Sequence, residues 1–178
     1  IMKNKDHLLF LDGFRGFAAL WVVMSHCLIL SGHTLPVLSK GGIAVDIFMI
    51  MSGFLMVFHY FKREALEPWE QSSTWLKFYV RRFFRIAPLY YLLFFIVMLL
   101  GHFLGDCRQA IAGVFPASHT SVERYTDHSF LNIFTHLTFI FGLLPNFAFT
   151  TPLPDWSIGL EMQFYLVFPF LMLFLRKN

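Results

Sequence analysis

Four long apolar runs set the main limit on what this chain can fold into. They cover approximately residues 8–30, 41–61, 83–104 and 157–175. Each is close to the roughly 20 residues that a helix needs to cross a bilayer. Of the 178 residues, 57% are hydrophobic and only 14% are charged, whereas a soluble domain is about 25% charged. The sequence therefore predicts the all-α class, as a polytopic transmembrane helical bundle.

A fifth apolar run, residues 130–144, is shorter and contains Asn132, Thr135 and His136. It is about five residues short of a typical span. It is either a tilted span or a re-entrant or interfacial helix packed against protein. The bundle therefore has four or five hydrophobic helices, and we expect that the fifth run does not cross.

The basic residues predict the orientation, because cytoplasmic segments of membrane proteins are rich in Lys and Arg. Lys3 and Lys5 precede the first run, so the N-terminus is expected in the cytoplasm. Residues 62–82 are expected there too, and residues 105–129 form a solvated loop on the opposite side. Six basic residues support this orientation, five between the second and third runs and one at the start of the third: Lys62, Arg63, Lys77, Arg81, Arg82 and Arg85.

Two further features follow from where the charges lie. A net charge of +3 that flanks apolar runs is not a nucleic-acid surface, so no nucleic-acid partner is expected. Asp12 and Arg15 stand where a cleaved signal peptide would be apolar, so the first run is expected to remain as a span. Arg176 and Lys177, after the last run, reach the cytoplasm only if the fifth run does not cross.

The first run contains an arginine and a histidine that share one helical face. Arg15 and His26 are eleven residues apart, which is three turns plus about 20° and an axial separation of about 16 Å. Arg15 is either an interfacial residue that extends to the headgroups or a ligand-binding group. His26 is either a neutral imidazole bonded to a neighbouring helix or a general base.

Two acidic residues lie inside predicted spans, where a carboxylate almost always faces protein or a water-filled cavity. Asp46, in the second run, is expected to be buried, and it either holds a helix pair or takes part directly in chemistry. Glu161, in the last run, has Tyr165 one turn further on as a hydrogen-bond partner. Glu161 holds a helix pair, conducts protons or orients a catalytic imidazole, and composition does not choose between these roles.

Arg82 and Arg85 are i, i+3 neighbours at the start of the third run, and Pro88 indicates a helix start or kink close by. One interpretation is a positive-inside anchor on anionic lipid. The other is a phosphate site, because guanidinium groups match the geometry of phosphate oxygens.

Four segments that contain these residues follow one another along the chain: "LDGFRGFAALWVVMSH", "GGIAVDIFMIMSGFLM", "FYVRRFFRIAPLYYLL" and "WSIGLEMQFYLVFP". Together they closely resemble the membrane-bound acyltransferase family 3, whose members acylate hydroxyl groups of glycans and related acceptors. Family members have about ten spans, so the resemblance implies that residues 1–178 are the N-terminal part of a single membrane acyltransferase domain. Full activity is then expected to need the C-terminal half.

The resemblance also implies roles for individual residues. The family's arginine, ten residues, histidine pattern falls on Arg15 and His26, and its arginine pair falls on Arg82 and Arg85. Its tryptophan–serine–glutamate–glutamine block begins at Trp156. The family's usual second glutamate is Met162 here, and Gly159 stands where serine is frequent. His26 and Glu161 are then the expected catalytic residues, with Arg15, Arg82 and Arg85 on the donor and with Asp46, Ser52 and Trp156 in support.

The implied reaction transfers an acyl group, expected to be acetyl, from acyl-CoA to a hydroxyl of a carbohydrate or cell-envelope glycan. The partners are membrane lipid, acyl-CoA and the glycan acceptor, with no metal expected. The implied location is the bacterial inner membrane. Two alternatives stay open from the residues alone. One is a transporter or acyl-group channel that uses His26, Asp46 and Glu161, and the other is a non-catalytic assembly protein.

Overall fold

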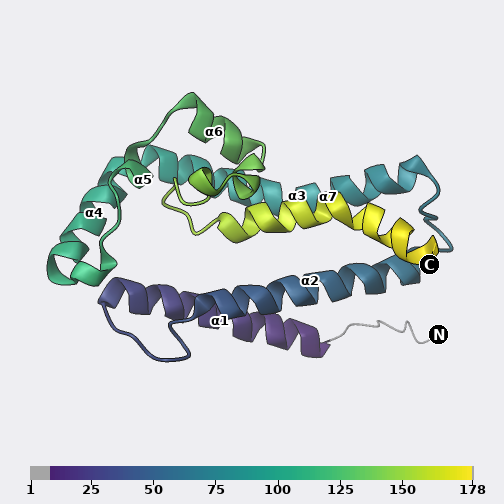
Figure 1. Ribbon diagram of the computed structural model, residues 1–178, viewed down its shortest axis with the longest axis horizontal. Helices are drawn as coiled ribbons and strands as arrows, with labels where there is room; N and C mark the ends of the chain where they lie inside the picture. The colour runs from purple at the N-terminus through teal and green to yellow at the C-terminus, as the bar shows by residue number, and fades with distance from the viewer. Residues whose placement is uncertain (1–8, 178) are drawn as a thin grey trace. The chain divides into compact units, whose positions relative to one another are not determined.

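The computed structural model describes residues 9–177, and this part of the chain is helical without strands. Four of its helices are long and apolar enough to cross a membrane, which confirms the predicted class and the lower of the two expected counts. Figure 1 shows them as α1 (Leu9–Ser31), α2 (Gly41–Arg63), α3 (Ser72–Leu99) and α7 (Trp156–Lys177).

The chain divides into two compact units. Unit 1 comprises residues 1–62 together with 115–118, and unit 2 comprises residues 63–114 and 119–178. Unit 1 therefore contains α1 and nearly all of α2, and unit 2 contains α3 and α7. Lys3 and Lys5, which support the predicted orientation, lie outside the described residues.

Unit 1 is a helical hairpin with a short connection over residues 32–40. Side chains of α1 hold this connection. Trp21 Nε1 donates to the Leu38 carbonyl oxygen at 3.2 Å. Ser25 Oγ donates to the Ser39 carbonyl at 3.1 Å and accepts from the Gly41 amide at 3.2 Å, at the first residue of α2. A Cβ atom at Gly41 would lie only 2.7 Å from Ser25 Oγ, so a glycine permits this close approach.

Unit 2 is built around α3 and α7, which lie side by side (Figure 1). The fifth apolar run packs against them as the short α6 (Phe130–Leu137) followed by two 3₁₀ turns, η2 (Ile140–Leu143) and η3 (Pro145–Phe147). Phe139 makes the bend between α6 and η2 in the left-handed region, at φ 59°. This conformation is rare for a bulky residue. Phe139 is part of a hydrophobic core cluster together with Ala87, Tyr90 and Phe141, and this packing supports its conformation.

The third helix differs from its prediction. It begins at Ser72, eleven residues before the predicted run, so Lys77, Arg81 and Arg82 lie within α3 and not in a loop. The predicted run started directly after Arg82, because charged residues lower hydropathy without preventing a helix. Pro88 is inside α3 and does not begin it. The segment expected to be cytoplasmic is therefore mostly helical.

The loop predicted over residues 105–129 is also largely helical, as α4 (Gly101–Val114) and α5 (Glu123–Thr126), with the turn η1 (Pro116–Ser118) between them. Packing explains the difference. Tyr125 is buried against Gly101 and Gly105, and a Cβ at either glycine would meet it at or inside van der Waals contact. Gly101 and Gly105 thus form a contact surface for α5.

The fifth run does not form a membrane-length helix. α6 has eight residues, a rise of about 12 Å against about 30 Å of hydrocarbon. At the far end of unit 2, Arg176 pairs with Glu64 at 3.0 Å and with Glu70 at 2.8 Å. The end of α7 therefore lies beside the connection between α2 and α3, as expected if residues 130–144 do not cross.

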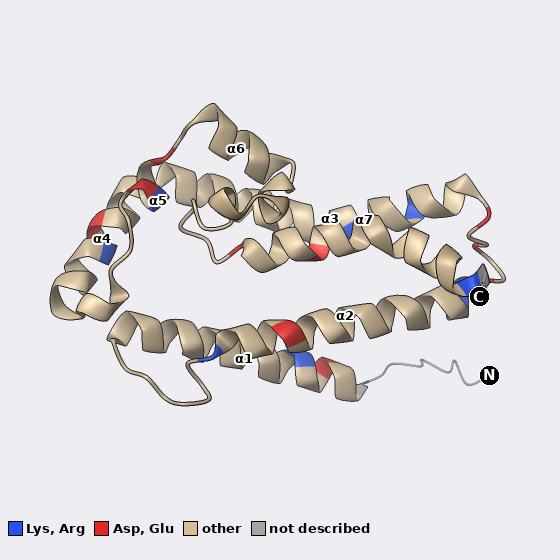
Figure 2. Ribbon diagram, viewed as in Figure 1, with Lys and Arg blue, Asp and Glu red and all other residues tan. Residues whose placement is uncertain are grey.

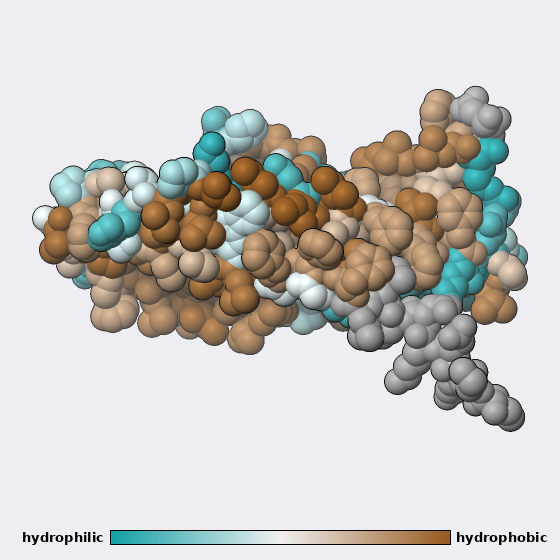
Figure 3. Space-filling model, turned by 90° about the horizontal axis from the view of Figure 1, so that it is seen from below, coloured by the Kyte–Doolittle hydropathy of each residue, from teal (hydrophilic) through white to brown (hydrophobic). Residues whose placement is uncertain are grey.

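Most of the long-helix surface is apolar. Phe14, Leu20, Ile50 and Phe170 are among many large hydrophobic side chains that are exposed. Figure 3 shows apolar side chains over much of one face, and Figure 2 shows that charged residues are sparse along the long helices. Such a surface suits lipid or further membrane helices.

Candidate functional site

The first part of the candidate site is on α1. His26 is exposed and Arg15 is half-buried. Their helical positions place them on one face, about 16 Å apart along the axis. Trp21 and Ser25, which hold the connection to α2, lie on the adjoining face and fix how α1 is rotated. The structure thus presents the imidazole and the guanidinium on one fixed face of a membrane helix.

The second helix gives a different result from the one expected. Asp46 is exposed, whereas Ala44 is fully buried. Two residues along a helix correspond to about 200° of rotation, so packing Ala44 inward turns Asp46 outward. The prediction that Asp46 is buried is therefore wrong for the described chain. Ser52, the other supporting residue on α2, is half-buried.

The second part of the candidate site joins α3 to α7 within unit 2. Tyr165 is buried and donates a hydrogen bond from its hydroxyl to Glu161 Oε1. The Arg82 guanidinium lies over the Tyr165 ring, 5.4 Å from its centroid, and over the Phe78 ring at 5.6 Å. The structure thus connects the predicted arginine pair to the predicted acidic block through one tyrosine.

The two arginines of the pair have different surroundings. Arg82 is half-buried between aromatic rings, whereas Arg85 is exposed. They are 10 and 13 residues from the first residue of α3, or about 15 and 20 Å along its axis. Trp156 is half-buried at the first position of α7. Arg85 is therefore free to contact a ligand, and Arg82 also stabilises the α3–α7 contact.

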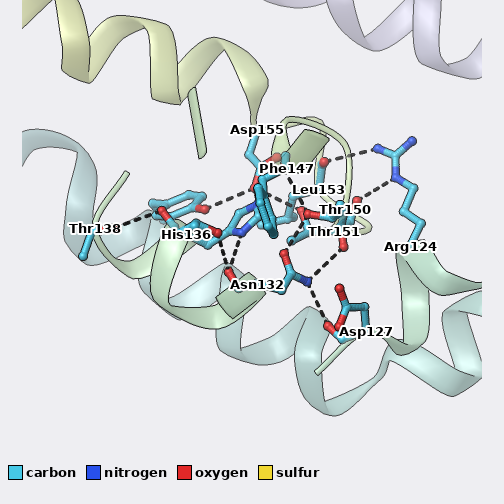
Figure 4. A network of polar contacts seen from close by, with 12 residues as sticks. Arg124, Asp127, Asn132, His136, Thr138, Phe147, Thr150, Thr151, Leu153 and Asp155 are labelled. Atoms are coloured by element: carbon cyan, nitrogen blue, oxygen red, sulfur yellow. Dashed lines mark hydrogen bonds and ion pairs between the residues drawn. The ribbon is translucent and has the colours of Figure 1, made fainter. Parts of the chain in front are cut away.

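A buried polar network, which was not predicted from the sequence, lies where α3, α6 and α7 meet (Figure 4). Asp155, the residue before α7, accepts at Oδ2 from Tyr90 at 3.1 Å and from Thr151 at 3.0 Å. His136 Nε2 lies 3.7 Å from the same oxygen. The His136 and Asp155 side chains are 0% and 1% exposed. Asp155 therefore ties the start of α7 to both α3 and α6.

Asn132 extends this network toward the loops. Its amide donates to the carbonyl oxygens of Asp127 and Thr150, and its own oxygen accepts from the Thr150 hydroxyl at 2.7 Å. Arg124 of α5 donates to the carbonyl oxygens of Thr151 and Leu153 at 2.6 and 3.3 Å. These bonds hold the segment before α7 in one conformation (Figure 4).

Burial sets the titration behaviour of the pair. It lowers the pKa of His136, partly opposed by the Asn132 carbonyl and by Asp155. It raises the pKa of Asp155, partly opposed by His136 and by the hydrogen bonds from Thr151 and Tyr90. Both shifts favour the uncharged forms, as expected where water does not reach.

A close backbone contact explains Gly159. A Cβ at this position would lie 2.8 Å from Gly142 Cα in η2 and 2.9 Å from Phe141 Cε2. Real side chains almost never approach so closely, so η2 leaves no room for a side chain on this face of α7. The contact lies two residues from Glu161 and one turn from Asp155.

The profile of the acyltransferase 3 family, described as an acyltransferase domain, matches residues 8–178. The chain belongs to the acyltransferase 3 family. The four sequence segments that indicated this family include Arg15, His26, Arg82, Arg85 and Glu161. No solved structure matches the chain.

Curated relatives of this family member come from bacteria and from an animal. It is 32% identical over 172 residues to the peptidoglycan O-acetyltransferase OatA of Listeria monocytogenes, covering 93% of this chain and 24% of that protein. It is 27% identical to the O-acetyltransferase OatA of Staphylococcus aureus, covering 98% and 26%. It is also 27% identical to the regulator of hypoxia-inducible factor 1 of Caenorhabditis elegans, covering 99% and 36%. The chain thus spans only about a quarter to a third of these relatives.

Proposed function

We propose that this chain is part of an integral membrane O-acyltransferase that moves an acetyl group from acetyl-CoA to a hydroxyl of a cell-envelope glycan. The observation that carries the proposal is the paired placement of Arg15 and His26 on one fixed face of α1. It occurs in a chain whose acyltransferase family is known. Their separation of about 16 Å suits a ligand with an anionic head and a distant reactive group.

The donor's phosphates are assigned to Arg15, Arg82 and Arg85. Guanidinium groups bind phosphate oxygens through paired hydrogen bonds, and the exposure of Arg85 supports direct contact. Arg82 contributes its charge from between the Phe78 and Tyr165 rings. The basic ends of these helices face the cytoplasm in this proposal, where acyl-CoA is available.

His26 is assigned as the general base. It removes the proton from the acceptor hydroxyl while the hydroxyl oxygen attacks the thioester carbonyl carbon. The carbon–sulfur bond then breaks, and the proton passes from the imidazolium to the departing thiolate. Glu161, held by Tyr165, is assigned as the second catalytic residue, because a carboxylate is the group that supports a histidine base in a catalytic triad. Asp46, Ser52 and Trp156 support the site.

The acceptor class comes from the relatives. The Listeria relative is named as a peptidoglycan O-acetyltransferase, so peptidoglycan is the first acceptor to test for this chain. A bacterial inner membrane location agrees with four membrane-length helices and with access to both acetyl-CoA and envelope glycan.

Membranes that contain the intact protein should be incubated with acetyl-CoA labelled in the acetyl group, and the labelled product identified. The proposal predicts an ester-linked acetyl group on glycan, in amounts matching the CoA released. Movement of solute without release of CoA would support the transporter alternative. A His26→Ala variant that fails to assemble in the membrane, with acetyl transfer unchanged, would support the assembly alternative.

A further inference from the structure

The hydrogen bonds of His136 define where its second proton binds. Nδ1 lies 2.8 Å from the Asn132 carbonyl oxygen, which only accepts hydrogen bonds. Nδ1 therefore bears a hydrogen. The proton that converts imidazole to imidazolium must bind at Nε2, which lies 3.7 Å from Asp155 Oδ2. Nε2 and Asp155 Oδ1 are both buried without a hydrogen-bond partner among the described residues.

One proton resolves an electrostatic conflict between these groups. Without it, the Nε2 lone pair faces a carboxylate in a site without solvent, where an uncompensated charge is costly. The proton sits either on Nε2, as an ion pair, or on Asp155, as a neutral pair. The Phe94 and Phe141 rings, stacked on the imidazole at 5.6 and 4.4 Å, favour a cation. Burial favours the neutral form, and both arrangements hold one proton.

The surrounding groups do not replace that proton. On α3, the Tyr90 hydroxyl donates to Asp155 Oδ2 and leaves Nε2 unpaired. Before α6, Asp127 accepts from the Ser129 amide and adds negative charge. On α5, the hydrogen bonds that fix Arg124 go to backbone carbonyl oxygens of the segment before α7. The remaining partner of Asp155 is the neutral hydroxyl of Thr151.

We propose that His136 and Asp155 bind one proton as a unit and that this unit positions Glu161 through α7. The positioning role rests on the proposed function of Glu161, whereas the one-proton unit does not. Asp155 immediately precedes α7, and Glu161 follows six residues later, about 9 Å along the axis. Tyr79 of α3 donates to the Leu166 carbonyl at 3.1 Å beyond Glu161. Glu161 thus lies between two contacts that set α7 against α3, and the proton controls one of them.

The proton count predicts how stability changes with pH. In an unfolded chain these two groups hold two protons below about pH 3.9, one up to about pH 6.5 and none above it. The folded pair holds one. Folding therefore takes up no proton between these values, so the contribution of the pair is constant there. Above about pH 6.5 the folded state holds the extra proton, so this contribution falls as pH rises.

The test measures the unfolding equilibrium constant of the intact protein in detergent from pH 5 to 9, for wild type, Asp155→Asn and the control Asp127→Asn. Replacing Asp155 leaves a neutral folded His136. That variant should lose stability as pH falls below about 6.5, by up to tenfold in the constant per pH unit, and stay flat above it. Wild type and Asp127→Asn should instead lose stability, relative to Asp155→Asn, as pH rises above about 6.5. Parallel profiles for wild type and Asp155→Asn would overturn the one-proton unit.

Two further measurements keep the proposal testable if Asp155→Asn does not fold. Nitrogen NMR of His136 and the infrared carboxyl band of Asp155 in wild type should show one proton on the pair beyond Nδ1–H at pH 7.5. Neither group protonated at that pH would overturn the proposal.

The positioning role is tested by acetyl transfer. The ratio of Asp155→Asn to wild-type transfer should fall several-fold between pH 7.5 and 5.5, while the ratio for Asp127→Asn stays constant. An unchanged ratio with the predicted stability profiles would remove the positioning role and leave the one-proton unit. Absence of transfer by wild type would instead contradict the proposed function.

Discussion

The polar residues of α1 and those at the start of α7 both lie in apolar surroundings, but they differ in burial. On α1, His26 is exposed on a helix whose rotation is fixed by neighbouring side chains. Before α7, Asp155 is enclosed and bonded to Tyr90 and Thr151. An exposed polar group on a membrane helix needs a ligand or another helix to meet it, whereas an enclosed and bonded group serves the fold.

Burial separates the exposed and the enclosed polar residues better than residue type does. A histidine occurs in both regions, at His26 and at His136. The first is exposed, and the second has every face covered. We therefore assign chemistry to α1 and positioning to the network around α7.

The strongest test of this contrast is His26→Ala. We expect acetyl transfer to fall by about 10² or more, because general acid–base catalysis contributes about 10² to 10⁴ in rate. Membrane insertion and thermal stability should stay near wild type, since His26 is exposed. His33→Ala, which removes another exposed histidine of unit 1, is the control and should keep activity. Transfer at the wild-type rate by well-expressed His26→Ala would contradict the assignment of His26 as the general base.

Gly159→Ala tests the packing side of the contrast. The added methyl group would overlap Gly142 Cα and Phe141, and overpacking typically costs about 1–3 kcal/mol. We expect a lower thermal unfolding midpoint together with weaker transfer. Gly42→Ala is a matched control, because a Cβ there meets nothing within 4 Å. Equal midpoints for the two variants would show that η2 does not constrain α7.

The arginine pair combines both environments, because Arg85 is exposed and Arg82 is half-buried. Arg82→Ala and Arg85→Ala should each raise the KM for acetyl-CoA by about tenfold, since a hydrogen bond to a charged group contributes about 1.5–3 kcal/mol. Lysine should rescue only in part, because it lacks the planar fork. Lys77→Ala, an exposed basic residue on the same helix, should leave KM unchanged. An unchanged KM in both alanine variants would favour a lipid anchor.

The smallest effect is expected at the connection between α2 and α3. Arg81 donates to both oxygens of Glu67, at 2.9 and 2.7 Å, and this lowers the pKa of that carboxyl. The contribution of the pair is therefore complete above the unfolded pKa of about 4.3 and is lost as pH falls through the lower folded value. Glu67→Gln should cost about 0.2–1 kcal/mol near neutral pH. Calorimetry should show no such loss in the exposed Glu123→Gln, and an equal loss in both would dismiss the ion pair.

Much of the fold followed from the lengths of the apolar runs, and the departures have physical causes. Apolar runs indicated α1, α2 and α7 closely, because membrane-length helices need continuous hydrophobicity. α3 began earlier than predicted because its first turns are helical but polar. Most of α4 was missed because the charged residues after residue 104 indicated a solvated loop, whereas Gly101 and Gly105 pack this helix against Tyr125.

The candidate site was predictable where its residues are close in sequence. The spacing of Arg15 and His26 and that of Glu161 and Tyr165 follow from one helix each. The contact between Arg82 and Tyr165 joins residues more than 80 positions apart, so no local pattern indicates it. Asp155 pairs with residues of two other segments in the same way. One signal was present, because Asn132, Thr135 and His136 share a face at i, i+3 and i+4 spacing and are all buried.

The side of donor binding and the role of His26 are tested most directly with sealed vesicles of both orientations. They are supplied from outside with labelled acetyl-CoA, which does not cross the membrane. Vesicles that expose the cytoplasmic face should transfer label to glycan, and those that expose the opposite face should not. The same vesicles with His26→Ala should transfer almost none. Transfer by vesicles that expose only the face opposite the cytoplasm would contradict the assignment of donor binding to the cytoplasmic side. Undiminished transfer without His26 would contradict its assignment as the base.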